Sequence, residues 1–304
     1  MSLTALLDVP APAKINLFLH IIGRRDDGYH LLQSVFALID WADTLHFERR
    51  SDGRLQRHDL GPALPADDLC LRAARALQQA SGCSAGADIS IDKQVPWGAG
   101  LGGGSSDAAS TLLALNRLWG LHWPRERLAA LAVTLGADVP FFIGGHNAFV
   151  EGIGERLTPI ELPESTYVVV KPAASIATSK IFSSPLLRRS TKPSIVMDFL
   201  AHNAKRNEAD AATQNGSATC TTGYGYNDLQ AAAEAECPEV TQVARWLETR
   251  YGNSRMSGSG SAVFARIDMQ QPPKATAQQD DHPAAWTART CRSLSRHPLV
   301  DWVS

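Results

Sequence analysis

The sequence predicts an α+β protein with two domains. Its 304 residues, 44% of them hydrophobic and 20% charged, have an ordinary globular composition. That length suits two domains of roughly 150 residues each. Segments with the alternation of strands and segments with the period of amphipathic helices follow one another along the chain. We place the boundary near residues 154–166, which gives an N-terminal domain over 1–155 and a C-terminal domain over 156–304.

The N-terminal half mixes predicted strands with predicted helices. Residues 45–47 alternate as a half-buried strand should, and Asp67 or Asp68 is a candidate N-cap for the first helix. Pro124 suits the first turn of a later helix, and Gly136 suits its C-cap. The predicted strands cover 13–22, 36–47, 87–95 and 149–153, and the predicted helices cover 69–80, 106–119 and 124–135.

The C-terminal half contains a segment of different composition. Residues 187–225 are rich in Ser, Thr, Asn, Ala and Gly, which predicts a long loop or a partly disordered insertion at about 188–225. A polar stretch over 270–281 predicts a surface loop. The predicted strands here are 167–171 and 262–267, and the predicted helices are 228–236 and 239–251.

The bulk properties exclude several classes of protein. A formal net charge of −2 and a pI of about 6.5 argue against a nucleic-acid partner. The sequence has no apolar run of the roughly 18 residues that a membrane span needs. Its first residues lack a basic region and are broken by Pro10 and Pro12, so we expect no signal peptide.

Cysteine usage indicates a reducing compartment. The five cysteines are odd in number, widely spaced and free of a CxxC motif, which favours neither a disulfide framework nor a zinc site. Cys70 and Cys237 lie in helical patterns, so we interpret them as packing residues. Together these features predict a cytoplasmic location.

The most informative stretch runs from Pro96 to Asp107 and holds five glycines within seven residues, followed by Ser105 and Ser106. Glycine lets backbone N–H groups approach a ligand closely. A helix that starts at Ser105 or Ser106 would add unpaired N–H donors and a positive dipole end. The stretch therefore predicts a phosphate-binding loop. A tight turn that only packs a strand against a helix is the alternative.

Two common phosphate sites do not fit this loop. Gly98, Gly100 and Gly103 match GxGxxG, but a helix containing Glu126 follows where a dinucleotide site needs a strand with an acidic residue. No lysine follows the glycines as a P-loop requires. The HRD and DFG motifs of protein kinases are absent as well.

Phosphoryl transfer also needs a cation and a group that positions the acceptor hydroxyl. Lys14 lies in an otherwise apolar strand, where it could supply the cation. The alternative is a charged residue at the edge of a strand with no part in catalysis. Asp138 lies between a helix stop and a very apolar run, where a helix or turn cap is the alternative. Tyr29 and His30 follow a turn and could hold a flat ligand or be merely exposed.

Five short segments of the sequence resemble those of a known family. The segments 12–17, 27–30, 96–106, 135–140 and 257–261 occur in the order seen in GHMP kinases. The likeness covers about residues 10–185 and 226–268, and the ending at 288–299 is also similar. The resemblance implies a ribosomal protein S5 domain 2-like N-terminal domain and a ferredoxin-like C-terminal domain.

The resemblance further implies an ATP-dependent small-molecule kinase of non-mevalonate isoprenoid biosynthesis. Its substrate would carry a cytidine diphosphate group, and its cofactors would be ATP and Mg²⁺, with the magnesium ligands and the oligomeric state unassigned. Lys14 and Asp138 match the catalytic pair, in which Asp138 would orient or deprotonate the acceptor hydroxyl. Lys14 would stabilise the charge that develops on the oxygens.

Other positions match binding residues of the family. The matches on the substrate side are Asn16, Tyr29, His30, Thr178 and Phe182, with His30 bonding the edge of the cytosine and the two other rings enclosing it. The matches around ATP are Lys93, Pro96, Gly98, Gly100, Leu101, Gly102, Gly103, Gly104, Ser105, Ser106 and Asn116. Asp68 departs from the pattern, because the family usually has Asn there beside the adenosine.

Two other functions remain open from the sequence. Another GHMP kinase, such as a homoserine or mevalonate kinase, would not need Tyr29, His30 and Phe182, because its substrate carries no base. A phosphate- or nucleotide-binding module without activity would need neither Lys14 nor Asp138.

Overall fold

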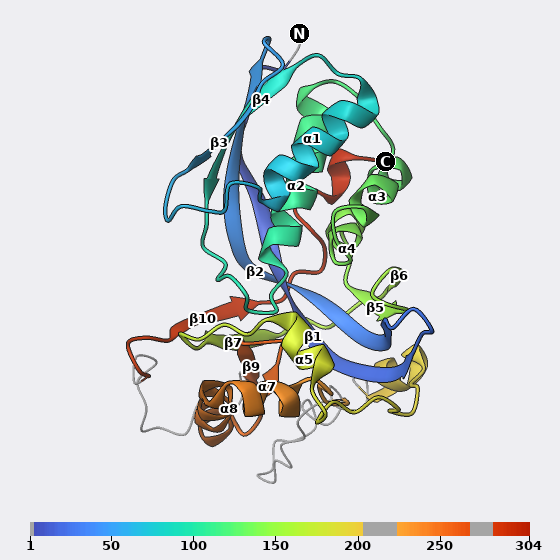
Figure 1. The fold of residues 1–304 in the computed structure, drawn as a ribbon, viewed down its shortest axis with the longest axis vertical. Helices are drawn as coiled ribbons and strands as arrows, with labels where there is room; N and C mark the ends of the chain where they lie inside the picture. Colours follow the sequence, from blue (N-terminus) through green and yellow to red (C-terminus); the bar gives the residue numbers. More distant parts are fainter. Residues whose placement is uncertain (1–2, 203–223, 268–281) are drawn as a thin grey trace.

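The computed structural model describes residues 3–202, 224–267 and 282–304. The described chain forms two sheets with helices packed on them (Figure 1). Strands β1 (Ala5–Arg24) and β2 (His30–Arg50) are long and antiparallel, and they extend from the upper part of the molecule into the lower part. Leu19 and Ile21 of β1 lie in the core of the C-terminal half, so this ribbon joins the two halves.

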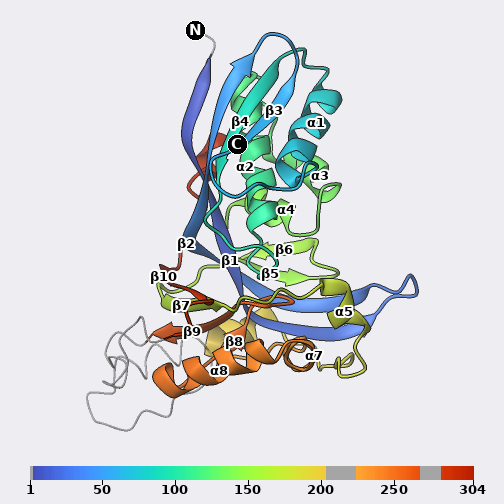
Figure 2. The same cartoon turned by 60° about the vertical axis from the view of Figure 1, so that its left-hand side comes forward.

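The first sheet has six strands in the order β3-β4-β2-β5-β6, with β1 paired to β2. Four helices cover one face of this sheet (Figure 2). The additional strands are β3 (Leu55–Asp59), β4 (Gly86–Asp92), β5 (Ala148–Glu151) and β6 (Arg156–Pro159). The helices are α1 (Leu69–Ser81), α2 (Gly103–Leu118), α3 (Arg125–Val133) and α4 (Val139–Gly144).

The second sheet has four strands in the order β10-β7-β9-β8. These strands are β7 (Thr166–Lys171), β8 (Arg255–Met256), β9 (Val263–Ile267) and β10 (Thr287–Arg292). The associated helices are α5 (Thr178–Ser183), α7 (Gln230–Glu236) and α8 (Pro238–Tyr251). A final 3₁₀ turn, η1 (Val300–Trp302), lies with the N-terminal helices, where Arg125 N–H donates to the Ser304 carbonyl at 3.0 Å.

The structure confirms most of the predicted elements and corrects several boundaries. Asp68 caps α1 as expected, through a 3.0 Å bond from Leu71 N–H. Helix α2 begins at Gly103, before the two serines, because Gly102 takes a positive φ of 71° and can end the loop there. Helix α3 ends at Val133 with Thr134 as its C-cap, so Gly136 is not the C-cap. Pro124 is the N-cap and lies just outside the first turn.

Sequence patterns missed the short elements. Strands β3, β6, β8 and β10 and helices α4 and α5 each contain six residues or fewer, so their periodic signal is weak. The chain leaves the first sheet after β6, which pairs with β5, and enters the second at β7. The domain limits themselves stay a prediction.

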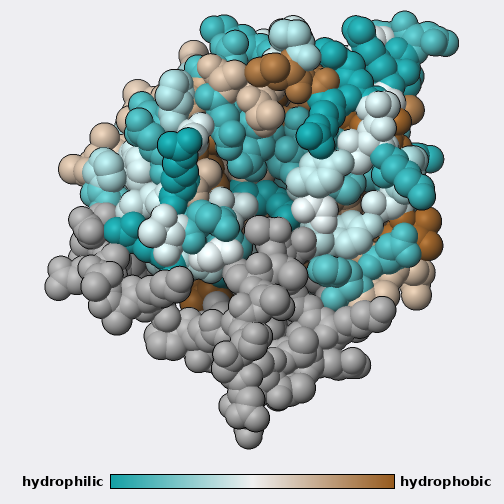
Figure 3. Space-filling view, turned by 90° about the horizontal axis from the view of Figure 1, so that it is seen from below, coloured by the Kyte–Doolittle hydropathy of each residue, from teal (hydrophilic) through white to brown (hydrophobic). Residues whose placement is uncertain are grey.

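Part of the expected insertion and all of the expected surface loop at 270–281 lie outside the described residues. Residues 188–202 are described and end in helical turns at 196–202, whereas 203–223 and 268–281 are not described. Over the described chain, no helix combines the length and the apolar character that a membrane crossing needs. Seen from below, the described surface is largely hydrophilic with small hydrophobic patches (Figure 3).

Cys70 and Cys237 are buried in the two cores, which confirms them as packing residues. Burial raises the pKa of the Cys70 thiol well above its usual range. A thiol held neutral in this way is a poor nucleophile.

Candidate active site

The glycine loop connects β4 to α2 and depends on residues without a Cβ. Gly98, Gly100 and Gly102 have φ values of 58°, 73° and 71°, which side chains rarely adopt. A Cβ on Gly100 would lie 2.1 Å from the carbonyl oxygen of Ser257, so the close approach of the two loops requires glycine. The alternative of a simple packing turn does not explain a cavity along the same loop.

Backbone hydrogen bonds hold this loop on both sides. The N–H of Lys14 on β1 donates to Leu101 O at 2.9 Å. From the C-terminal half, Ala262 N–H donates to Ala99 O at 3.1 Å. The loop is therefore fixed between the long N-terminal strand and the turn at 257–261, which comes from a distant part of the sequence.

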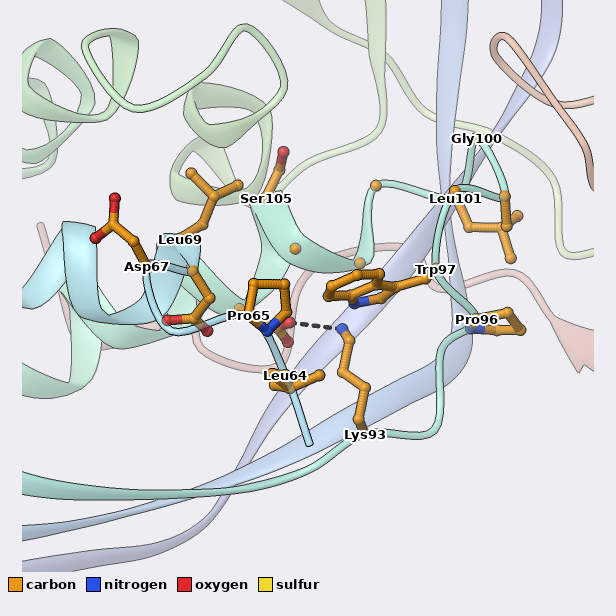
Figure 4. Close-up of a pocket in the computed structure, with 17 residues that line it drawn as sticks. Leu64, Pro65, Asp67, Leu69, Lys93, Pro96, Trp97, Gly100, Leu101 and Ser105 are labelled. Carbon is orange, nitrogen blue, oxygen red and sulfur yellow. Dashed lines mark hydrogen bonds and ion pairs between the residues drawn. The ribbon is translucent and has the colours of Figure 1, made fainter. Parts of the chain in front are cut away.

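A pocket of about 400 Å³ opens along the loop. Residues 96–105 line it together with Leu64, Pro65 and 67–69, and Lys93 points into the space among them (Figure 4). Asp107 is also a lining residue. Trp97 is 53% exposed and lies over this space. The volume falls in the roughly 300–1,000 Å³ range of small-molecule sites.

Lys14 and Asp138 face one another beside the loop. Lys14 Nζ lies 3.6 Å from Asp138 Oδ2 and donates to Asn16 Oδ1 at 2.6 Å and to Gly100 O at 3.2 Å. Its side chain is 4% exposed, so the interpretation as a strand-edge charge is wrong. Burial lowers the pKa of Lys14, and the opposing charge of Asp138 limits that shift.

Asp138 is at the N-cap position of α4, but its side chain accepts no capping hydrogen bond. The interpretation as a helix cap is therefore wrong. The side chain is 31% exposed, so the carboxylate is open to solvent on one side and faces Lys14 on the other. A group placed like this can reach a ligand that lies beside Lys14.

Asn16 is held in one orientation by neighbouring hydroxyls. Its Nδ2 donates to Ser34 Oγ at 2.9 Å, and its backbone N–H donates to Ser257 Oγ at 3.1 Å. The Asn16 carbonyl oxygen therefore faces Lys14. The Ser257 hydroxyl also donates to Gly100 O at 2.9 Å, which links the second loop to the first.

The predicted cytosine-binding residues lie at the start of β2, where Tyr29 and His30 are, and on α5, which contains Phe182. The rings of His30 and Phe182 stack with centroids 5.2 Å apart and planes inclined by 29°. Burial lowers the pKa of His30, and the charges of Arg189 and Arg24 add to this effect. Tyr29 is 60% exposed, so the structure brings together two of the three rings and leaves the third open to solvent.

Of two further predicted site residues, Thr178 lies next to the 257–261 turn, whereas Asn116 lies away from the pocket. Thr178 begins α5, and its hydroxyl lies 2.8 Å from that of Ser259 in the 257–261 turn. Asn116 is not brought to the pocket. Its amide donates to Trp123 O at 3.1 Å and accepts from Trp123 N–H at 2.9 Å. A helical rise of about 1.5 Å per residue puts it roughly 20 Å along α2 from the loop.

Sequence reasoning missed Asp43, Asp107 and Trp97. Asp107 follows the two serines directly and is 3% exposed, so an acidic residue on a buried helical face was the available signal. Asp43 gave no signal, because only the fold brings it to Lys93. The unusual Asp68 lines the pocket and pairs with Arg57 at 2.9 Å.

Comparison with known proteins assigns the family. The model "GHMP kinases N terminal domain" matches residues 68–146, and "GHMP kinases C terminal" matches residues 208–281. A 4-diphosphocytidyl-2-C-methyl-D-erythritol kinase of Methylibium petroleiphilum is 63% identical over 99% of both chains. One from Variovorax paradoxus is 54% identical over 99% of both. The chain belongs to the 4-diphosphocytidyl-2-C-methyl-D-erythritol kinase family.

A solved structure supports the same family. The crystal structure of a 4-(cytidine 5'-diphospho)-2C-methyl-D-erythritol kinase has 35% sequence identity and a TM-score of 0.72. The match covers 95% of this chain and 98% of that one. The prediction of a two-domain GHMP kinase fold is therefore confirmed. The glycine loop and Asp138 both lie within the residues matched by the N-terminal domain model.

Proposed function

We propose that this chain transfers the γ-phosphoryl group of ATP to the 2-hydroxyl of 4-diphosphocytidyl-2-C-methyl-D-erythritol, in non-mevalonate isoprenoid biosynthesis. The names of its relatives supply the substrate. The observation that carries the chemistry is the 3.6 Å approach of buried Lys14 to Asp138 next to the glycine loop. A module that only binds nucleotides has no need for such a pair.

GHMP kinases use ATP, generally with Mg²⁺. The triphosphate would lie along the loop, where glycines expose backbone N–H groups and α2 contributes its N-terminal dipole. The exposed indole of Trp97 and the apolar side chains of Leu64 and Leu69 lie on the same pocket and suit the base. We keep Pro96, Leu101 and the loop glycines as contacts for ATP and remove Asn116 from that set.

The residues near the loop fit a magnesium ion bound mainly by phosphate oxygens. Among the described residues, no group of three His, Cys, Asp or Glu side chains could hold a metal by itself. Ser105 lines the pocket, and the buried hydroxyl of Ser106 has no hydrogen-bond partner. Mg²⁺ often takes few protein oxygens and keeps several waters. These two hydroxyls would hold it, and its charge would offset that of the phosphates.

Asp138 would accept the proton of the substrate hydroxyl or align that hydroxyl for attack on the γ-phosphorus. Lys14 would stabilise the negative charge on the attacking oxygen. Because Lys14 is anchored by Asn16 and by Gly100 O, little reorganisation is needed when this charge develops. Phosphoryl transfer depends mainly on such positioning and charge stabilisation.

The cytidine end of the substrate would lie at His30 and Phe182, with Tyr29 next to His30 in the chain and Thr178 one turn before Phe182 on α5. His30 Nε2 is buried and has no hydrogen-bond partner, so it is available to the edge of a base. Entry of the base would require the stacked His30 and Phe182 rings to separate or Tyr29 to swing over them.

A coupled assay of ADP release tests the proposal. The purified chain, ATP and Mg²⁺ are combined with 4-diphosphocytidyl-2-C-methyl-D-erythritol, with homoserine or with mevalonate. We expect turnover with the first acceptor and none above background with the other two. Turnover of homoserine or mevalonate at a comparable kcat/KM would contradict the assignment of the acceptor.

A further inference from the structure

A buried ionic cluster lies at the base of the glycine loop, apart from Lys14 and Asp138. Lys93 follows β4, and its Nζ contacts Asp43 on β2. The same Nζ lies 2.6 Å from Asp107 Oδ2 on α2, the contact that the dashed line at Lys93 marks in Figure 4. Asp43 is fully buried and Asp107 is 3% exposed. Burying three charged groups costs free energy unless they are paired and hydrogen-bonded, so their placement indicates a specific role.

Asp43 holds both the backbone and the side chain of the segment that enters the loop. Its Oδ1 accepts the N–H groups of Gln94 at 2.6 Å and Val95 at 2.7 Å, and its Oδ2 contacts Lys93. One carboxylate from a neighbouring strand therefore fixes the last three residues before Pro96.

Lys93 connects this entry segment to the exit of the loop. Asp107 lies in the second turn of α2, and its Oδ1 has no hydrogen-bond partner in the part of the chain that the structure describes. The other oxygen, Oδ2, accepts the hydrogen bond from Lys93. This bond joins residues 93 and 107, which lie on either side of a segment with three glycines at positive φ. Such a segment has many accessible conformations when its ends are free.

The charge state of Lys93 suits this connection. Burial lowers the pKa of Lys93, but the neighbouring Asp107 and Asp43 outweigh it and raise that pKa above its ordinary value. The ammonium stays charged and contacts both carboxyl groups, while burial raises the pKa of Asp107 well above its usual range against the opposing effect of the Lys93 charge. The ammonium is therefore poorly placed to act as a free cation for phosphates.

We propose that Asp43, Lys93 and Asp107 form a loop clamp, an ionic bridge that holds the glycine loop in the shape that binds the triphosphate. The inference rests on the proposed ATP site. Asp43 and Asp107 are positioning residues, and Lys93 acts on the nucleotide through the loop. This changes the prediction that Lys93 itself contacts ATP.

Kinetics and hydrogen exchange of Asp43→Asn, Lys93→Met and the double variant test the clamp. Each single change should raise KM for ATP by about tenfold, the loss expected for one charged hydrogen bond. KM for the diphosphocytidyl substrate should change less than about twofold, because the cytidine site lies elsewhere. The double variant should be no worse than the worse single one, because both changes break the same bridge. Amides of residues 94–104 should exchange faster in all three.

Asp228→Asn is the matched control. Asp228 is also a buried carboxylate that accepts a backbone N–H, from Ile21 at 2.7 Å, and a hydroxyl, from Thr191 at 2.7 Å. It lies outside the loop, so its loss should lower thermal stability without changing KM for ATP or exchange at 94–104. If Lys93→Met does not fold, Asp107→Asn replaces it, with the same direction and a smaller rise in KM.

Two outcomes would overturn the clamp. One is unchanged KM for ATP and unchanged loop exchange in Asp43→Asn. The other is a Lys93→Met defect far larger than that of Asp43→Asn and additive with it, which would make Lys93 a direct phosphate contact. Hydrogen exchange of the loop is measured without substrate. If the wild-type chain does not phosphorylate the diphosphocytidyl substrate, the proposed function is refuted, but the exchange data still test the clamp.

Discussion

Lys14 Nζ and Asp138 Oδ2 lie 3.6 Å apart, although one residue is on the first strand and the other precedes the fourth helix. The glycine loop makes this pairing possible. A Cβ on Gly102 would lie 3.2 Å from the Lys14 side chain, so Lys14 packs closely along the loop backbone. The cation, the carboxylate and the phosphate-binding loop thus share one small volume.

Asp138→Ala should reduce turnover by about 10²- to 10⁴-fold, because it removes the group proposed to position or deprotonate the hydroxyl. The affinity for ATP, measured by calorimetry, should stay nearly unchanged. A melting curve of the variant checks that the loss of turnover does not come from unfolding, because the buried Lys14 loses its partner carboxylate. Near-normal turnover would refute the assignment of the base.

His30→Ala should raise KM for the cytidine-bearing substrate more than KM for ATP, because it removes a ring stacked on Phe182 and a free ring nitrogen. Steady-state kinetics with each substrate varied in turn would measure the two constants. His58→Ala, at a half-exposed histidine on β3, is a control that should change neither. A rise confined to the ATP constant would show that the cytidine site lies elsewhere.

Gly100→Ala should abolish measurable activity, because its Cβ would overlap the Ser257 carbonyl and because its φ of 73° disfavours a side chain. Gly120→Ala separates these two causes. Gly120 has a similar φ of 67°, but its nearest neighbouring atom would be 4.0 Å from the new Cβ. The control should lose roughly 1 kcal/mol of stability at constant activity. Equal activities for the two variants would contradict the required approach of the loops.

His297 should make the protein less stable in mild acid. Burial lowers its pKa to about 4, and the charge of Arg125 adds to this shift. In the unfolded chain the imidazole takes up a proton below about pH 6.5, whereas in the folded chain it stays neutral down to about pH 4. Stability should therefore fall as the pH drops through this interval, by about 3 kcal/mol in total.

His297→Asn provides the comparison, because an amide oxygen can still accept the Leu299 N–H that now donates to His297 Nδ1 at 3.1 Å. Urea unfolding between pH 4 and 7 would measure both proteins. The difference between them should shrink or reverse in acid, since the variant lacks the titrating group. Parallel curves over the whole range would show that His297 is not responsible.

The sequence by itself predicted the helices with clear periods, the glycine loop and the residue types for phosphoryl transfer. It identified Lys14 and Asp138 because a charged residue is conspicuous beside apolar neighbours. It also led to the family, through short motifs whose order along the chain is informative. These are local properties, and a linear pattern can carry them.

The tertiary structure decided which residues meet. Asp43 comes to Lys93 only because β2 pairs with β4, and Ser257 reaches Gly100 only because the second loop packs on the first. Asn116 has a suitable side chain, but the straight path of α2 carries it away from the loop. Hydrogen bonds and ion pairs act over a few ångströms, so they depend on pairing and packing that sequence spacing does not contain.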